Sequence, residues 1–325
     1  MDKVNWGILG TARIAEQQLI PAMQSAVNAH LLGVASRNET QANAYAQHNG
    51  IERAYGSYAQ LLADPDIDAV YIPLPNDLHA EWTLQAAQAG KHVLCEKPAA
   101  LNAAQAREMV QACAAHDVVF MEAFMYPFHP QWDRVRELLN SGELGELKIV
   151  HANFSYPLEN PADIRWHPQM GGGSLYDVGC YCVHVARSLA DNAPTVEVQG
   201  IAQFMEDGVV DKSFTGAFKF ANGLLAHFDC SFEAADRQFV EIVGSRGSIQ
   251  VLYPFRPDMG TPTLIVHGPS GEHRETFPTT DMYKLQVEHF GDCVQSQQTP
   301  RNTGEDSIRN MEHIDALYTA AGRQS

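Results

Sequence analysis

Short apolar runs alternate with helical stretches through the first third of the chain. Strands are predicted at 4–9, 31–35, 69–72, 92–95 and 118–121, because these runs are short, apolar and bounded by turn residues. Helices are predicted between them at 41–48, 58–63, 78–89 and 102–116. In the helical stretch after the first strand, Pro21 predicts a break or kink and opens a new turn. Alternation of this kind is typical of an α/β domain with a doubly wound parallel sheet.

The pattern changes after Glu122. A helix at 130–141 is followed by strand-like runs at 148–156, 196–204, 213–220, 224–232, 239–243, 248–252 and 264–266. Because most of these strands follow one another without an intervening helix, they predict a large, open, mostly antiparallel sheet in an α+β domain. We therefore expect two domains, at 1–122 and 123–325, as is usual for a chain of 325 residues.

Composition and charge exclude several classes of partner. Lys and Arg number 22 against 39 Asp and Glu, and a net charge of −17 repels the phosphates of nucleic acid. The apolar runs are too short to span a bilayer and no export signal opens the chain, so we expect no membrane association. Six cysteines without regular spacing are expected to be reduced thiols in the cytoplasm, and no metal site is expected.

The turn after the first strand resembles a phosphate-binding turn. Its residues are Gly10, Thr11, Ala12, Arg13 and Ile14, a variant of G-x-G-x-x-[GA] in which Ala12 replaces the second glycine. The following helix would still offer free N–H groups and the positive end of its dipole to a pyrophosphate. The turn therefore predicts a dinucleotide site in the first domain.

The end of the second predicted strand indicates the type of dinucleotide. An acidic residue is expected there when the ribose is unphosphorylated, but this chain has Ser36 and Arg37. A hydroxyl and a guanidinium suit a 2′-phosphate, so NADP(H) is the expected cofactor, with NAD(H) as an open alternative. Arg37 could equally be a solvated arginine at the end of a strand.

A lysine follows the buried run at 92–95, in the sequence Cys95-Glu96-Lys97-Pro98. Ligands of open parallel sheets bind at the carboxyl ends of the strands, so Lys97 is placed where cofactor and substrate meet. The alternative is a solvated lysine paired with Glu96. After the neighbouring strand, Asn76 is expected to cap the next helix, and His79 in its first turn is either structural or close to the dinucleotide.

A second polar group lies in the second domain. The long loop at 157–173 contains Arg165, Trp166 and His167 and ends in three glycines. The helix that follows carries Asp177, Tyr181 and His184 at spacing i, i+4, i+7, which predicts one shared face. His184 is interpreted as a core histidine.

Tyr181 and Lys97 together suit hydride-transfer chemistry. Removing a hydride from a carbinol carbon requires a base for the hydroxyl proton, while a dinucleotide accepts the hydride. A phenol has a pKa of about 10, but a nearby ammonium favours the phenolate. Tyr181 is therefore the candidate proton carrier, Lys97 the candidate cation, and Asp177 a candidate partner that holds Lys97 or relays a proton.

These motifs resemble the glucose-fructose oxidoreductase and inositol dehydrogenase family. The resemblance rests on Gly10–Ala15, Ser36-Arg37, 73–79, Glu96-Lys97-Pro98, 122–126, and the glycines before Asp177 and Tyr181. It implies a Rossmann domain, an open-faced sheet domain and NAD(P)-dependent oxidation or reduction of a sugar, polyol or dihydrodiol. It is strongest with the branch of dimeric dihydrodiol dehydrogenases and NADP-dependent aldose dehydrogenases. Relatives usually have arginine in place of Pro127, and often Lys or Arg in place of Gln41.

The resemblance also implies which residues contact the ligands. Besides the turn and Ser36-Arg37, the expected cofactor contacts are Leu74, Asn76, His79, Glu96, Lys97, Arg165 and Trp166. The expected substrate contacts are Tyr126, Tyr156, His167 and Tyr181.

Two further function classes are considered for this sequence. A dinucleotide-sensing protein of the same fold would bind without turnover, but it would not need Lys97, Asp177 and Tyr181. A reductase of bilin-type or imine substrates should lack the helix that carries Asp177 and Tyr181. The enzyme is also expected to form a homodimer, or a dimer of dimers, through an apolar face of the second sheet. The residues expected on that face are Phe218, Phe220, Leu225, Phe228 and Phe232.

Overall fold

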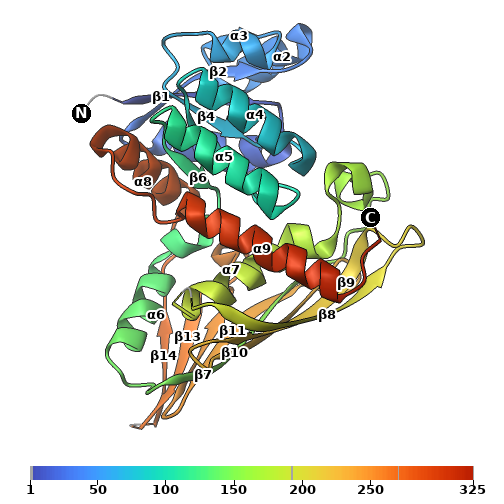
Figure 1. Ribbon diagram of the computed structural model, residues 1–325. Helices are drawn as coiled ribbons and strands as arrows, with labels where there is room; N and C mark the ends of the chain where they lie inside the picture. The colour runs from blue at the N-terminus through green and yellow to red at the C-terminus, as the bar shows by residue number, and fades with distance from the viewer. Residues whose placement is uncertain (1–2, 192, 270, 325) are drawn as a thin grey trace. The chain divides into compact units, whose positions relative to one another are not determined.

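The computed structural model describes residues 3–191, 193–269 and 271–324, which form two compact units (Figure 1). The first unit comprises Met1–Phe124 and Asp281–Met311, and the second comprises Met125–Thr280 and Glu312–Ser325. The first division falls two residues beyond the predicted boundary at 122. The expectation that everything after residue 122 belongs to the second domain needs correction, because Asp281–Met311 returns to the first unit.

The first unit contains a parallel sheet of six strands in the order β3-β2-β1-β4-β5-β6. The strands are β1 (Val4–Leu9), β2 (Ala29–Ala35), β3 (Arg53–Tyr55), β4 (Ala69–Ile72), β5 (His92–Cys95) and β6 (Phe120–Glu122). This is the doubly wound order, with the chain reversing direction across the sheet between β3 and β4. The pattern of apolar runs did not predict β3, whose residues are all only half-buried.

The helices of this unit are α1 (Ile20–Ser25), α2 (Glu39–Asn49), α3 (Tyr58–Leu62), α4 (Asn76–Gln88) and α5 (Ala103–Ala115). Pro21 opens a new turn, as predicted, because it occupies the first turn of α1, directly after a π-helical segment, η1 (Ala15–Leu19). Proline lacks an N–H that the first turn does not need. The predicted cap at Asn76 is wrong, since Asn76 is the first residue of α4 and Pro75 holds the cap position.

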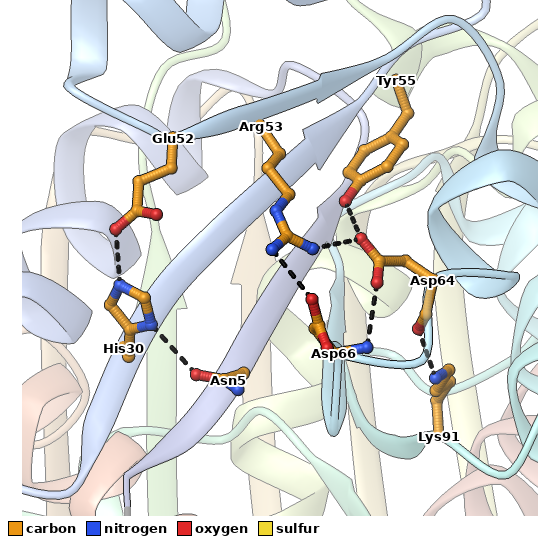
Figure 2. A network of polar contacts seen from close by, with 8 residues as sticks. All are labelled: Asn5, His30, Glu52, Arg53, Tyr55, Asp64, Asp66 and Lys91. Atoms are coloured by element: carbon orange, nitrogen blue, oxygen red, sulfur yellow. Dashed lines mark hydrogen bonds and ion pairs between the residues drawn. The ribbon is translucent and has the colours of Figure 1, made fainter.

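A polar network holds the short strand β3 in place, as Figure 2 shows. The Arg53 guanidinium contacts Asp64 at 2.7 Å and Asp66 at 2.8 Å, and the Tyr55 hydroxyl donates to Asp64. Lys91 Nζ donates to the Asp64 carbonyl at 2.7 Å. Charged contacts therefore replace the apolar burial that would have made β3 recognisable in the sequence.

The returning segment 281–311 contains α8 (Met282–Ser296) and the start of α9 (Gly304–Ala320). Figure 1 shows α8, near the red end of the colour scale, in the unit that holds the blue N-terminal strands. The Phe290 ring lies 5.0 Å from the ring of Trp6, and Asn28 Nδ2 donates to the Glu288 carbonyl at 2.8 Å. Asn302 Nδ2 donates to the carbonyls of residues 122 and 124. These contacts join residues far apart in the sequence, so a local pattern could not predict them.

The second unit contains an eight-stranded sheet in the order β14-β13-β12-β11-β7-β10-β9-β8. Its strands are β7 (Leu147–Ser155), β8 (Thr195–Phe204), β9 (Asp211–Phe220), β10 (Leu225–Ser231), β11 (Arg237–Gly244), β12 (Ser248–Leu252), β13 (Thr263–Gly268) and β14 (Gly271–Thr276). All neighbours are antiparallel except β7 and β10. The exposed, polar strand β14 was not predicted.

The helical segments of this unit are short, apart from two longer helices. They are η2 (Tyr126–Phe128), α6 (Pro130–Asn140), η3 (Ile164–Trp166), η4 (Pro168–Met170), η5 (Leu175–Gly179), α7 (Cys180–Leu189) and η6 (Pro257–Met259). The segments η3 and η4 lie in the predicted long loop, and η5 is a π-helix that runs directly into α7. The helix predicted to carry Asp177 and Tyr181 is therefore a π-helix followed by an α-helix.

The prediction placed the wrong side chains on the open face of the second sheet. Phe218, Phe220, Phe228 and Phe232 are at most 3% exposed, because they point toward helices of their own unit. Phe218, for example, packs its ring 5.2 Å from the ring of His313 in α9. Of the five predicted residues, only Leu225 lies on the outer face, where it is 48% exposed.

The described residues offer neither a membrane-spanning helix nor a cluster of metal-binding side chains. Within residues 3–191, 193–269 and 271–324, no helix is both long and apolar enough to cross a bilayer. The same ranges contain no group of three or more His, Cys, Asp or Glu side chains placed to hold a metal ion. All six cysteines are buried free thiols.

Candidate functional site

The turn after β1 is built around Gly10. Gly10 has φ +108°, which L-residues rarely adopt, and a Cβ there would lie 3.0 Å from Leu74 Cδ2. The chain then enters a continuous helical run at Arg13. The Ala12 carbonyl accepts a hydrogen bond from the Tyr45 hydroxyl at 3.2 Å, which fixes the turn. The local geometry is that of a turn that presents a helix N-terminus to a phosphate.

Gln41 connects this turn to the end of β2. Its Nε2 donates to Thr11 Oγ1 at 2.9 Å, and its Oε1 accepts from Ser36 Oγ at 3.3 Å. Arg37 is exposed beside the Tyr58 phenol; burial raises the pKa of Tyr58 and the nearby guanidinium opposes this shift. Gln41 thus brings Thr11 and Ser36 together although they belong to turns after two different strands. The role of Gln41 was not predicted, since a bridging amide has no sequence signature.

The loop that carries Lys97 is anchored from several sides. The Tyr71 hydroxyl donates to Glu96 Oε1 at 2.6 Å, and the backbone N–H of Lys97 donates to Glu96 Oε2 at 3.2 Å. The backbone N–H of Ala99 donates to the buried Glu122 carboxylate at 2.8 Å. Glu96 therefore holds the backbone on which Lys97 stands.

His79 supports the same loop from below. Its ring nitrogens lie 2.9 Å from the Pro98 carbonyl and 2.8 Å from the Leu74 carbonyl. The ring is 0% exposed, and burial lowers its pKa, while the two carbonyls oppose this shift. A ring with no exposed surface cannot touch a cofactor. The predicted cofactor contact of His79 is therefore corrected to a structural role, the alternative that was left open.

In the second unit, Asp177 is held by two side chains. Arg165 Nε lies 2.9 Å from Asp177 Oδ2, and the Tyr156 hydroxyl donates to the same oxygen at 2.7 Å. Arg165 also pairs with Asp163 at 3.1 Å, and the Asp177 carboxylate raises the pKa of the guanidinium. These contacts connect the loop at 157–173 to the π-helix.

Tyr181 lies in an aromatic enclosure. Its ring is 5.5 Å from Phe154, 5.4 Å from Phe255 and 6.0 Å from Tyr126, and only 4% of the residue is exposed. Its hydroxyl contacts Met125 Sδ at 3.5 Å. Sulfur is a weak acceptor, so this contact does little to fix the proton.

Tyr126 and His184 form a buried pair beside Tyr181. The Tyr126 hydroxyl lies 2.5 Å from His184 Nδ1, and burial raises the pKa of Tyr126. This contact agrees with the interpretation of His184 as a bonded core histidine. It differs from the predicted substrate contact of Tyr126, because the hydroxyl is engaged within the unit. Pro127 lies in the same buried 3-10 turn.

Trp166 and Tyr156 share a packing partner. Their rings lie 5.2 Å and 5.5 Å from the ring of Phe232, which is buried just after the end of β10. His167 is exposed, and its carbonyl accepts from the N–H of Gly172. Phe232 is thus a site-supporting residue that the sequence placed on the wrong face of the sheet.

Comparison with known proteins identifies both halves of the chain. Residues 4–124 match the model of an oxidoreductase family with an NAD-binding Rossmann fold. Residues 132–250 match the model of the GFO/IDH/MocA C-terminal domain. The chain belongs to the Gfo/Idh/MocA oxidoreductase family. The predicted resemblance and the predicted fold class are confirmed, and the chain is an NAD(P)-dependent oxidoreductase.

Individual relatives cover nearly the whole chain. It is 40% identical over 318 residues to D-xylose 1-dehydrogenase (NADP(+)) 2 of Haloferax volcanii, which covers 97% of both chains. It is 34% identical to trans-1,2-dihydrobenzene-1,2-diol dehydrogenase of Xenopus laevis over 76% of this chain and 74% of that protein. A crystal structure of KijD10, a 3-ketoreductase from Actinomadura kijaniata in complex with NADP and TDP-benzene, matches with a TM-score of 0.90 at 30% identity, covering 98% of each chain.

Proposed function

We propose that this Gfo/Idh/MocA oxidoreductase is an NADP(H)-preferring dehydrogenase or reductase of a sugar, a polyol or a dihydrodiol. The observation that carries the proposal is the enclosed Tyr181 phenol, four residues after a carboxylate held by Arg165 and Tyr156. Such a phenol suits the transfer of one proton to or from a substrate oxygen. Two relatives, named as dehydrogenases of D-xylose and of a dihydrodiol, act on substrates of the proposed class.

In the proposed reaction the cofactor exchanges the hydride and the protein transfers the proton. When bound, the nicotinamide exchanges a hydride with the carbinol or carbonyl carbon. Tyr181 takes the hydroxyl proton in oxidation or returns it in reduction, and Lys97 supplies the positive charge that favours the phenolate. The Asp177 carboxylate, held by Arg165, is proposed to hold Lys97 or to relay a proton.

Cofactor preference is proposed from the end of β2. Ser36 and Arg37 stand where an acidic residue would bind an unphosphorylated ribose. The Haloferax relative carries NADP(+) in its name, and the KijD10 structure contains NADP. Gln41, an amide in place of a second basic residue, leaves Arg37 as the main charge available to a 2′-phosphate.

The proposed ligand contacts are the predicted ones without His79 and Tyr126. For the cofactor they are Gly10, Thr11, Ala12, Arg13, Ile14, Ser36, Arg37, Leu74, Asn76, Glu96, Lys97, Arg165 and Trp166. For the substrate they are Tyr156, His167 and Tyr181. Aromatic rings around Tyr181 favour a substrate with a flat apolar face, such as a pyranose or a dihydrodiol.

We also propose self-association and a cytoplasmic location. The outer face of the sheet exposes Ile149 at 42%, Leu225 at 48% and Ile201 at 75%. A hollow of about 660 Å³ on this face is lined by residues that include Phe239, Leu252, Tyr253 and Met259. Such a face favours a second copy of the chain as its partner. Six free, buried thiols favour a reducing compartment.

The experiment is a turnover screen with a matched variant. Cofactor absorbance is followed with NADP+ and a panel of aldoses, polyols and dihydrodiols, and with NADPH and the corresponding carbonyls. Tyr181→Phe keeps the ring and removes the proton carrier, so turnover should fall by roughly 10²- to 10⁴-fold while cofactor affinity stays unchanged. Near-normal turnover in Tyr181→Phe, or no turnover by the wild type across the panel, would overturn the proposal.

A further inference from the structure

The helix that carries Asp177 and Tyr181 begins at a buried carboxylate from another element. Asp211, the first residue of β9, is 0% exposed. Its Oδ2 accepts from Ser174 Oγ at 2.6 Å and from the Leu175 N–H at 2.8 Å. Its Oδ1 accepts from the Tyr318 hydroxyl at 2.7 Å. One carboxylate therefore joins the start of the helix, β9 and the end of α9.

Gly173 makes this contact possible. Its φ is +131°, and a Cβ there would collide with Asp211 Oδ1 and lie 2.9 Å from the Tyr318 hydroxyl. The last glycine of the predicted run therefore permits the carboxylate to reach the first N–H groups of the helix. An acid at this position satisfies donors that a helix otherwise leaves unpaired.

The C-terminal end of the chain supports the same turn. Arg323 Nη1 donates to the Tyr176 hydroxyl at 3.0 Å, and its Nε donates to the Val209 carbonyl at 2.9 Å. The guanidinium carbon lies 4.1 Å from the centre of the Tyr318 ring, a cation–π distance. Tyr176 immediately precedes Asp177, so the arginine holds the residue next to the carboxylate of the site.

The helix starts as a π-helix, so the anchoring of this start affects the positions of Asp177 and Tyr181. Leu175–Gly179 has i→i+5 bonding, and α7 follows from Cys180. The angle between Asp177 and Tyr181 around the helix therefore depends on where the π-helical segment gives way to the α-helix. A start displaced by a fraction of a residue would move both side chains, and a displacement of about 1 Å at a reacting group can cost about 100-fold in rate.

We propose that Asp211 is a positioning residue for Asp177 and Tyr181, with Tyr318 and Arg323 supporting it from the C-terminal end of the chain. The inference rests on the proposed role of Tyr181. It adds a function for the last residues of the chain: they hold the beginning of the helix that carries the proton carrier.

The test compares steady-state kinetics of Asp211→Asn with wild type, using NADP+ and the alcohol that turns over fastest in the panel above. The amide keeps the shape but replaces one acceptor oxygen with a donor. We expect kcat to fall roughly 10- to 100-fold with little change in the KM for NADP+. The pH at which kcat reaches half its maximum should rise, because a displaced phenol is less stabilised as phenolate. Asp117→Asn, the same substitution at an exposed residue of the first unit, is the matched control and should match wild type in both readouts.

Two further variants keep the test decisive if Asp211→Asn does not fold. Tyr318→Phe removes one donor to Asp211, and Arg323→Met removes the clamp on Tyr176. Each should lower kcat several-fold and shift the pH profile in the same direction. Folded variants with wild-type kcat and pH profile would overturn the inference. If Tyr181→Phe is inactive while these variants match wild type, only the positioning role fails. If Tyr181→Phe is active, the proposed function fails.

Discussion

At the scale of single residues, the pairing of Lys97 with Tyr181 is the proposal with the largest expected effect. An ammonium stabilises a phenolate, so removing either group removes the same assistance to proton transfer. Lys97→Met and Tyr181→Phe should each lower kcat by roughly 10²- to 10⁴-fold, and the double variant should be little worse than either single one. Kinetics of all three variants test this. Losses that multiply would mean that the two groups act independently.

A second prediction at this scale concerns Arg37 and the affinity for NADP(H). A charge-assisted contact to phosphate contributes roughly 1.5 to 3 kcal/mol, so Arg37→Ala should weaken NADP(H) binding roughly 10- to 150-fold. NAD(H) binding should change little, because NAD(H) lacks the 2′-phosphate. Fluorescence titration of both reduced cofactors measures the effect. Equal affinities of the wild type for NADPH and NADH would contradict the assignment of Ser36 and Arg37.

At the scale of elements, β3 is stabilised mainly by charged contacts, whereas the neighbouring strands are stabilised by buried apolar side chains. Hydrogen bonding from Tyr55, the N–H of Asp66 and the Arg53 guanidinium lowers the pKa of Asp64 to about 2, against the opposing effect of burial. A lowered pKa in the folded state stabilises the fold above the ordinary pKa of the carboxyl. That contribution is lost as the pH falls through about 2.

We therefore expect Asp64→Asn to destabilise the protein near neutral pH and to have a smaller effect at pH values closer to the lowered pKa. Urea unfolding of wild type and variant across the acid range measures this difference. Tyr55→Phe should show a weaker form of the same behaviour, since Tyr55 supplies the leading hydrogen bond. Glu81→Gln, on the exposed surface of α4, serves as the control and should show no such pH-dependent difference. A destabilisation of Asp64→Asn that does not vary with pH would contradict the account of β3.

At the scale of the whole molecule, the proposed self-association is assigned to the outer face of the second sheet. Ile201→Lys places a charge on this face, and Val27→Lys places the same charge on an equally exposed residue of the first unit. Both positions are 75% exposed, so they are matched in surface area. Light scattering at micromolar concentration should detect a dimer or tetramer in wild type and Val27→Lys and a smaller species in Ile201→Lys. A monomeric wild type would contradict the proposal.

The outer face of the second sheet also shows what a local sequence pattern cannot predict. Alternation in β9 and β10 predicted strands, yet it could not say which face the phenylalanines occupy. The answer depends on α9, which lies about 90 residues further along the chain, and on contacts such as Phe214 with Tyr318. The same limit applies to Asp281–Met311, whose place in the first unit is set by partners near residues 6, 28 and 122–124.

The sequence by itself determined the two fold classes, the glycine turn at Gly10, the family and the chemical types of Lys97, Asp177 and Tyr181. These follow from local periodicity and from motifs whose spacing is short. The tertiary structure alone decided that Gln41 bridges Thr11 and Ser36, that His79 is structural, and that Asp177 is held by Arg165 and Tyr156. It also decided that Asp211 anchors the helix at Ser174. Each of these depends on side chains brought together by folding, and a linear pattern does not record which distant groups will meet.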